Sequence, residues 1–164
     1  MVPYAFNANI SAANQTIALK AMAEISAGSG VLFIAHTTTP DWIVFNASNV
    51  NNSRIGMVGG AQTINITSWG VKYIVVHEIM HALGYIHEQQ RPDRDNLVTL
   101  NVANISLTAC PGSNCGILPG NCLCNFNIVN GATMATAYDF LSIMHYGRSA
   151  FGVNNQDTIT CQPA

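Results

Sequence analysis

Apolar residues near the start of the chain fall into two successive patterns that predict a strand followed by a helix. Residues 2–6, VPYAF, indicate a short strand, and Ser11 can cap the helix that follows it. The apolar positions that recur at helical spacing in this helix are Ile17, Ala18, Ala21, Met22 and Ile25. We expect Gly28 and Gly30 to end the helix, because glycine adopts the backbone conformation that stops one.

Three further segments have the β-branched and aromatic composition of strands. Segments 31–36 and 41–47 are separated by a Thr-Thr-Thr-Pro turn, so we expect them to be neighbouring strands. Segment 56–67 predicts another strand, which Gly59 and Gly60 weaken because glycine lacks a side chain to pack. Together with the first strand, these segments predict a sheet in the first half of the chain.

The periodicity then changes from helical to irregular. A second helix is predicted from about Val71 to Leu83, and the chain becomes polar after Gly84, with one short helical candidate around 136–141. At 164 residues the chain fits one domain. We therefore expect an α+β fold in a single domain, residues 1–164, with a mixed sheet and two helices followed by a loop-rich part.

Composition and charge exclude two classes of partner. Only six Lys and Arg residues are present, they are scattered, and the net charge is −2, so no basic surface for nucleic acid or anionic lipid is expected. No apolar run reaches the roughly 18 residues that cross a bilayer. We therefore expect a protein that binds neither nucleic acid nor membrane.

The cysteines indicate an oxidising compartment. Four of the five lie in a segment rich in Pro, Gly and Asn, namely Cys110, Cys115, Cys122 and Cys124. We expect a loop closed by disulfides, with either Cys161 or one loop thiol left free, and the pairing stays open. A structural zinc knot is the alternative, but the spacings match no common zinc motif. A secreted, extracellular protein follows.

Residues 77–87 place three histidines in a chain that has five. His77 and His81 are four positions apart and therefore share one helix face, where they can bind a single ion. Glu78 is one position round from His77, and Gly84 can turn the chain so that His87 becomes a third ligand. Histidines that merely pack on an apolar face are the alternative, since HExxH also occurs by chance.

Three imidazoles around an ion with a fourth position open to water are typical of a catalytic zinc site, whereas a structural site has four protein ligands. An open position implies hydrolysis, because zinc lowers the pKa of its bound water to about 7. Glu78 is then suited to take a proton from that water and to deliver it to the departing amine.

The chain resembles the astacins, a family of zinc endopeptidases within the metzincins. A downstream segment, SIMHYG at 142–147, and the extended motif HExxHxxGFxHEQxRxDRD carry the resemblance, with Tyr85 at the usual Phe position. The residues that match this motif are His77, Glu78, His81, Gly84, His87, Glu88, Gln89, Arg91, Asp93, Arg94 and Asp95. Weaker similarity covers nearly the whole chain.

The resemblance implies a metzincin fold with an N-terminal subdomain, residues 1–87, and a C-terminal subdomain, residues 88–164, across an active-site cleft. It implies that Met144 forms an apolar floor beneath the zinc ligands. Tyr146 matches a tyrosine that can be an additional metal ligand and can stabilise the oxyanion of the transition state. Glu88 matches a residue that binds the buried amino terminus, and pairing with a nearby arginine is its alternative role.

The segment with Gly59, Gly60 and Gln62 resembles the edge strand on which astacins bind an extended substrate through main-chain hydrogen bonds. A plain edge strand with a bulge is the alternative. The charged cluster of the motif is interpreted as a structural ion-pair network rather than a substrate site, and His145 as a structural residue.

Together these observations predict a secreted zinc-dependent endopeptidase that hydrolyses peptide bonds through a zinc-bound water. We expect one catalytic Zn²⁺, a protein or peptide substrate and a monomeric enzyme. A non-catalytic astacin-like binding protein, or a zinc hydrolase of another substrate class, are the alternatives. Retention of both Glu78 and Tyr146 argues against the non-catalytic protein.

Overall fold

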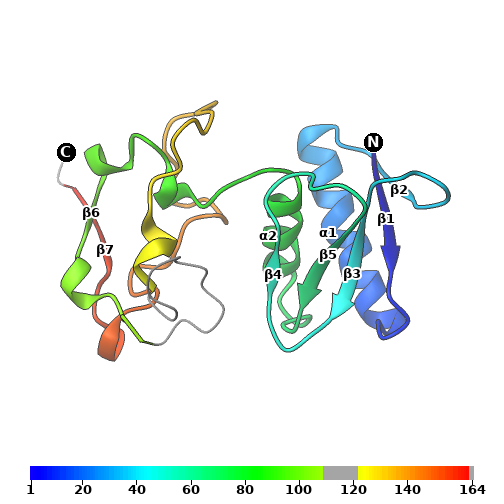
Figure 1. Ribbon diagram of the computed structural model, residues 1–164, viewed down its shortest axis with the longest axis horizontal. Helices are drawn as coiled ribbons and strands as arrows, with labels where there is room; N and C mark the ends of the chain where they lie inside the picture. The colour runs from blue at the N-terminus through cyan, green and yellow to red at the C-terminus, as the bar shows by residue number, and fades with distance from the viewer. Residues whose placement is uncertain (109–121, 163–164) are drawn as a thin grey trace. The chain divides into compact units, whose positions relative to one another are not determined.

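The computed structural model describes residues 1–108 and 122–162. The chain divides into two compact units, Met1–Tyr85 and Ile86–Ala164, here called the sheet unit and the loop unit (Figure 1). The boundary that the resemblance implies, after position 87, is two residues later. The fold is α+β, as expected, with both α-helices in the sheet unit and mostly irregular backbone in the loop unit.

A five-stranded mixed sheet forms the sheet unit, in the order β2-β1-β3-β5-β4. Its strands are β1 (Val2–Phe6), β2 (Phe33–Ala35), β3 (Trp42–Ala47), β4 (Asn52–Ser53) and β5 (Ala61–Ile66). The pairings from β2 to β5 are parallel, and only β4 runs antiparallel to its neighbour. The expected strand at 56–67 therefore begins only at Ala61, after a series of turns.

The prediction that segments 31–36 and 41–47 are neighbouring strands is wrong, because β1 lies between them. β2 pairs with the first half of β1 and β3 pairs with its second half, and Tyr4 of β1 is opposite both Ala35 and Ile43. The short connection between β2 and β3 therefore does not have to run back along the length of β1. It only has to cross β1, which a turn of this length can do.

Helix α1 (Ala12–Ser29) begins where the sequence predicts it. The Ser11 side chain accepts a hydrogen bond from the Asn14 N–H at 3.2 Å, which satisfies one of the free donors of the first turn. At the other end Gly30 has a φ of 73°, the left-handed conformation of a C-cap, whereas Gly28 lies inside the helix. Only one of the two glycines named above therefore ends the helix.

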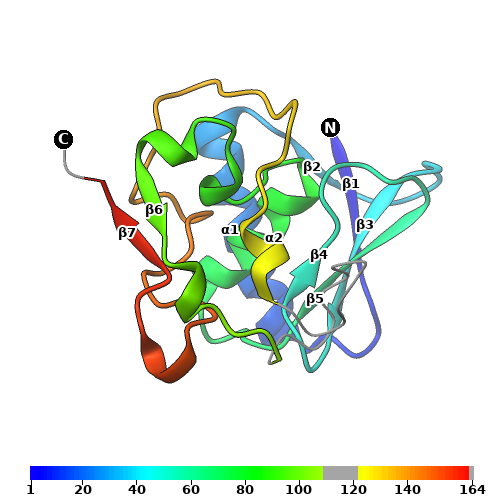
Figure 2. The same cartoon turned by 60° about the vertical axis from the view of Figure 1, so that its left-hand side comes forward.

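Helix α2 (Lys72–Ala82) lies beside α1 on one face of the sheet (Figures 1 and 2). The sheet face that the helices cover is apolar, since Phe45 of β3 and Ile64 of β5 are fully buried and pack in one core with Val75 and Ile79 of α2. Neither described helix is long and apolar enough to cross a membrane. The core thus fixes α2, and with it the first two histidines of the motif.

The loop unit contains little regular structure. A two-stranded antiparallel sheet joins β6 (Val98–Leu100) to β7 (Ile159–Cys161). Its 3₁₀ helices are η1 (Glu88–Gln90), η2 (Arg94–Asn96), η3 (Val102–Asn104), η4 (Cys122–Phe126) and η5 (Val153–Asn155). The prediction of a helix around 136–141 is wrong, because this segment is irregular.

Part of the expected disulfide loop falls among the described residues. Cys122 and Cys124 are disulfide-bonded, whereas Cys161 is a free and exposed thiol. Cys110 and Cys115 lie outside the described residues. Of the two options that the sequence left open for the unpaired thiol, Cys161 is the one that the structure supports.

Candidate metal centre

Helix α2 carries the first two histidines of the motif one turn apart. The rings of His77 and His81 lie with their centroids 4.6 Å apart and nearly perpendicular, at 86°. The helix ends at Ala82, and Gly84 has a φ of 104°, a conformation that residues with a side chain rarely adopt. Gly84 therefore turns the chain away from the helix axis, as the sequence predicts, before it reaches His87.

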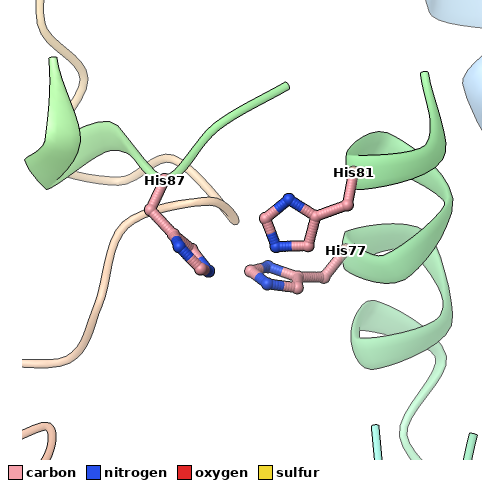
Figure 3. A group of neighbouring side chains, drawn as sticks. All are labelled: His77, His81 and His87. Carbon is pink, nitrogen blue, oxygen red and sulfur yellow. The ribbon is translucent and has the colours of Figure 1, made fainter. Parts of the chain in front are cut away.

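His77, His81 and His87 form a group that could hold one metal ion (Figure 3). Each offers a ring nitrogen, and these three atoms all lie within 4.8 Å of one another. Zn–N bonds of about 2.0–2.1 Å in tetrahedral geometry put two ligand nitrogens about 3.4 Å apart. The donor set and its spacing therefore fit a single zinc ion, and the three residues are those that the sequence predicts as ligands.

Hydrogen bonds on the outer side of two rings set their tautomers. His81 Nδ1 lies 2.8 Å from the Tyr85 carbonyl oxygen, and His87 Nδ1 lies 3.3 Å from Gln90 Oε1. Because both partners are oxygens that can only accept, each Nδ1 carries the proton. Nε2 of each ring is then the unprotonated nitrogen, which is the form that binds a metal, and the outer partner holds the ring in orientation.

The Glu78 carboxyl group is buried beside the first histidine, with 5% of the residue exposed. Burial raises the pKa of Glu78 to about 7. Its Oε2 is one of three buried side-chain atoms in the described ranges that have no hydrogen-bond partner. A buried oxygen without a partner is costly in a merely structural residue and is common where a group must act on a ligand.

Burial also affects the second histidine. It lowers the pKa of His81; the hydrogen bond with the Tyr85 carbonyl raises this pKa by less, and the nearby His77 lowers it further. A lowered pKa keeps the imidazole neutral at pH 7, which is the form that binds metals.

Met144 and Tyr146 lie in the turn that the sequence compares with a methionine turn. Met144 is buried, with 3% exposed, and its carbonyl accepts a hydrogen bond from the Glu88 N–H at 3.0 Å. The Tyr146 ring is 4.3 Å from the His87 ring, centroid to centroid. The turn is therefore attached to the start of the loop unit, where the third histidine lies.

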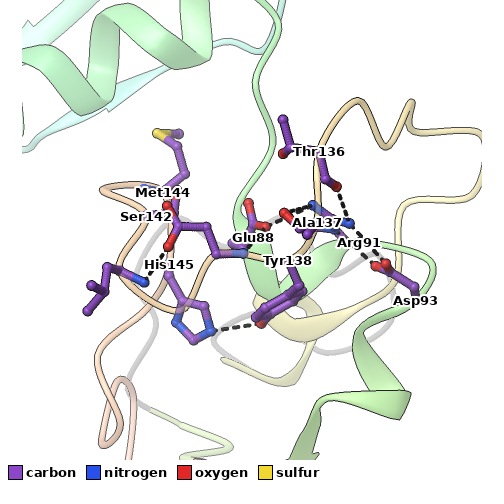
Figure 4. A network of polar contacts seen from close by, with 11 residues as sticks. Glu88, Arg91, Asp93, Thr136, Ala137, Tyr138, Ser142, Met144 and His145 are labelled. Atoms are coloured by element: carbon purple, nitrogen blue, oxygen red, sulfur yellow. Dashed lines mark hydrogen bonds and ion pairs between the residues drawn. The ribbon is translucent and has the colours of Figure 1, made fainter.

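Glu88 pairs with an arginine, which is the alternative that the sequence left open. Its Oε1 accepts hydrogen bonds from Arg91 Nη1 and from the Asp139 N–H, both at 3.0 Å. Arg91 also binds Asp93 in a two-pronged contact, with distances of 3.0 and 2.9 Å (Figure 4). A structural role for this cluster agrees with the sequence interpretation.

The remaining basic residue of the cluster connects separate segments of the loop unit. Arg94 is buried, and its Nη1 donates to the Gln89 carbonyl at 2.9 Å and to the Phe126 carbonyl at 2.7 Å. It also forms an ion pair with Asp95. Arg94 therefore ties η4 to the motif segment by a charge-assisted contact.

The three residues proposed for the substrate strand do not share one strand. Gly59 and Gly60 lie in the turn before β5, where both have positive φ, and Gln62 lies in β5. The Gln62 side chain is buried, accepts from the Val58 N–H at 3.0 Å and donates to the Arg54 carbonyl at 3.1 Å. The strands at the two edges of the sheet are β2 and β4. All three residues, among others, line a cavity of about 210 Å³.

Sequence reasoning missed three groups that contact predicted site residues. The Tyr85 carbonyl is a backbone group, so no residue type announces it. Gln90 falls on a variable position of the motif, and Tyr138 lies in the segment mistaken for a helix. The residue types give no signal here, because these contacts depend on irregular backbone that periodicity does not describe.

Comparison with known proteins gives a consistent result. The Astacin family profile (Peptidase family M12A) matches residues 1–164. High choriolytic enzyme 2 of Oryzias latipes is 33% identical over 166 residues, which cover 99% of this chain and 55% of that protein. Zinc metalloproteinase nas-12 of Caenorhabditis elegans is 32% identical over 155 residues, 93% of this chain and 37% of that protein. The chain thus spans about half the length, or less, of the curated relatives it matches.

Solved structures agree. High choriolytic enzyme 1, described as a hatching enzyme zinc-protease of the same fish, superposes with a TM-score of 0.84 and 32% identity, over 99% of this chain and 76% of that chain. Myroilysin superposes with a TM-score of 0.63 and 18% identity, over 96% of this chain and 82% of that chain, and supports the fold alone.

Proposed function

The chain belongs to the astacin family, peptidase family M12A, and from this membership we propose that it is a zinc-dependent endopeptidase that hydrolyses peptide bonds in proteins or peptides. The observation that carries the proposal is the group formed by His77, His81 and His87. The buried carboxyl group of Glu78 directly follows the first of these histidines in sequence. The names of two relatives, a zinc metalloproteinase and a hatching enzyme zinc-protease, support the same activity.

The three imidazoles would hold one zinc ion. A bound zinc ion supplies a Lewis acid that raises the acidity of water and polarises a carbonyl group. The protein's part is to present neutral Nε2 atoms, which the outer hydrogen bonds of His81 and His87 favour. An ion held by these three side chains would keep a position open for solvent and substrate, unlike a structural site with four ligands.

Glu78 is the proposed general base and general acid. Its carboxylate takes a proton from the attacking water and passes it to the amine nitrogen that leaves, so that one group serves both halves of the reaction. The unpartnered, buried Oε2 supports this role, since no other group in the described part of the chain competes for it.

Tyr146 is the proposed oxyanion donor, because its phenol can donate a hydrogen bond to the negative charge that develops on the substrate carbonyl oxygen. The contact of its ring with the His87 ring supports this assignment. We propose supporting roles for three neighbours: Met144 as an apolar floor, Gly84 as the turn that delivers the third histidine, and Glu88 as a partner of Arg91.

The substrate backbone is proposed to bind beside Gly59, Gly60 and Gln62. Glycines without side chains leave room for another main chain to approach, and the buried Gln62 amide braces the turn that carries them. Binding through main-chain hydrogen bonds supplies affinity that does not depend on the substrate's sequence.

Residues 1–164 are proposed to form a single catalytic domain that acts as a monomer outside the cell. The disulfide-bonded Cys122 and Cys124 support an oxidising compartment. Alkylation of the unreduced protein should label Cys161 alone, with the other four cysteines of the chain unlabelled until reduction. Labelling of three or more cysteines before reduction would contradict the extracellular assignment.

The decisive experiment replaces Glu78 by glutamine, which keeps the shape of the side chain and removes its basic oxygen. We expect zinc content near one ion per chain in both proteins and a loss of at least about 100-fold in kcat for Glu78→Gln on a quenched fluorescent peptide. Glu24→Gln is the matched control, because Glu24 is an exposed residue of α1 that pairs with Lys72. Equal activity of parent and Glu78→Gln would refute the mechanism.

Metal binding is tested separately by replacing histidines. His77→Gln should lose zinc, whereas His36→Gln should retain it, since the His36 ring stacks on Trp42 and belongs to no metal group among the described residues. A parent protein that binds zinc but cleaves no peptide in a library would favour the non-catalytic binding protein. Cleavage of esters alone would favour a hydrolase of another substrate class.

A further inference from the structure

The backbone of Tyr146 is held at both of its polar groups by side chains of the loop unit. The Tyr146 N–H donates to Gln89 Oε1 at 3.1 Å, and the Tyr146 carbonyl oxygen lies 2.7 Å from His145 Nδ1. Gln89 is completely buried, with 0% exposed. Because Tyr146 lies outside any helix or strand, these two contacts replace the hydrogen bonds that regular structure would have supplied.

The contact with the carbonyl group fixes the tautomer of His145. A carbonyl oxygen can only accept, so Nδ1 must carry the proton, and Nε2 of the neutral ring is then an acceptor. The Tyr138 hydroxyl lies 2.7 Å from this Nε2 and therefore donates to it (Figure 4). Burial raises the pKa of Tyr138, which keeps that hydroxyl protonated.

Tyr138 is in turn fixed by the arginine of the charged cluster. The Arg91 guanidinium lies 5.4 Å from the Tyr138 ring centroid, in a cation–π arrangement. Arg91 also donates to the Thr136 carbonyl at 3.0 Å and to the Ala137 carbonyl at 3.3 Å. The irregular segment that leads to Tyr138 is therefore attached to η1 by a buried side chain.

We infer that Gln89, His145 and Tyr138 are positioning residues for Tyr146, and we call these three the tyrosine clamp. The inference rests on the proposed function, in which the Tyr146 hydroxyl stabilises the oxyanion. The clamp residues act through Tyr146 rather than on the substrate. A donor that must meet charge developing in the transition state has to be held in place beforehand, and a displacement of about 1 Å can cost about 100-fold in rate.

The first arm of the test measures kcat and KM of the zinc-loaded enzyme on a fluorescent peptide. Tyr146→Phe should lower kcat by about 100-fold. His145→Leu removes both contacts of the ring and should lower kcat by about tenfold, with KM within about twofold. His145→Asn should restore much of the loss, because the Asn amide nitrogen occupies the position of Nδ1 and can donate to the same carbonyl.

The second arm combines substitutions of His145 and Tyr138 with Tyr146→Phe. A residue that acts only through the Tyr146 hydroxyl has nothing left to position, so His145→Leu and Tyr138→Phe should each lower kcat by less than about twofold in that background. A residue needed only for folding would lower activity equally in both backgrounds. Tyr73→Phe, on an exposed tyrosine of α2, is the matched control and should change nothing. Equal losses in both backgrounds would overturn the clamp.

The third arm uses the metal-free protein and does not depend on activity. ¹⁵N spectra should show His145 protonated at Nδ1, and the Tyr146 amide should exchange slowly with deuterium and become at least about tenfold faster in Gln89→Met. The opposite tautomer, or an amide that exchanges equally fast in both proteins, would overturn the clamp. A parent that cleaves no peptide would refute the proposed function, while these spectra would still decide the clamp.

Discussion

The sheet unit and the loop unit are stabilised in different ways. In the sheet unit fourteen buried apolar residues, twelve of them from the sheet and both helices, form one core. In the described part of the loop unit only five do so, around Val98 and Phe126, whereas Gln89, Arg91 and Arg94 are buried polar residues. The first unit therefore relies on apolar burial and the second on hydrogen bonds from side chains to backbone.

The difference matters because the two units position their functional side chains in different ways. Helix α2 holds two histidines on a rigid element, so their spacing follows from helix geometry. Tyr146 lies on irregular backbone, and its orientation depends on a few specific side chains. A change in the first unit should therefore act on stability, whereas a change in the second should also act on the position of a functional group.

The largest effect on stability is expected in the core of the sheet unit. Met22→Ala in α1 should lower the free energy of unfolding by about 2–5 kcal/mol, because it leaves a cavity at a buried position. Leu19→Ala, one turn away on the exposed face of the same helix, should change it by less than about 0.5 kcal/mol. Urea titrations followed by fluorescence of Trp42 and Trp69 measure both, and equal losses would contradict the assigned core.

The second-largest effect on stability is expected in the loop unit. Arg91→Met removes the ion pairs with Glu88 and Asp93 and the contacts with two backbone carbonyls, so the local free energy of opening should fall by about 2–3 kcal/mol. Deuterium exchange should accelerate over residues 136–146 and stay unchanged in the sheet unit. Arg54→Met, at an exposed position, is the control and should leave both units unchanged.

Sequence patterns predicted the elements of the sheet unit well and their arrangement less well. Periodicity reports burial, and burial is what forms β1, α1 and α2, so their existence and approximate ends follow from residues such as Met22 and Val75. The order of the strands does not follow, because β1 separates β2 from β3 through pairings that no local pattern encodes.

In the loop unit the sequence predicted chemistry but not structure. The spacing of the motif identified His87, since metal ligands are restricted to few residue types. The segment 136–141 was predicted as a helix and is irregular. Its Tyr138 packs against the Arg91 guanidinium, a contact that periodicity does not predict. The motif includes Gln89, but sequence reasoning assigned no role to this residue, because a buried amide that accepts from one backbone N–H has no periodic signature.

A third, smaller effect tests a side-chain-to-backbone bond within the sheet unit. Ser11→Ala removes the acceptor for the Asn14 N–H and should lower the free energy of unfolding by about 1 kcal/mol. Ser11→Asp retains an acceptor at the cap and should stay within about 0.5 kcal/mol of the parent. Thermal or urea unfolding measures the difference. A loss as large as that of Met22→Ala would show that local capping, and not the core, dominates this unit.

The smallest effect is a dependence on pH in the loop unit. The hydrogen bond with Arg91 lowers the pKa of Asp93 below its ordinary value of 3.8. A carboxyl group whose pKa is lower in the folded state stabilises that state above the unfolded pKa and loses this contribution as the pH falls through the folded pKa. Since 32% of the Asp93 side chain is exposed, the contribution is screened and should be only about 0.5 kcal/mol.

Asp93→Asn should therefore be less stable than the parent by a constant amount between about pH 5 and 7, and the difference should shrink below about pH 4. Raising the salt concentration should reduce the difference at neutral pH as well. In the Arg91→Met background the same substitution should have almost no pH dependence, because the cation that lowers the pKa of Asp93 is gone. A pH dependence that persists there would assign the pKa shift of Asp93 to another group, and Arg91 would then stabilise the loop through Glu88 and the two carbonyl contacts.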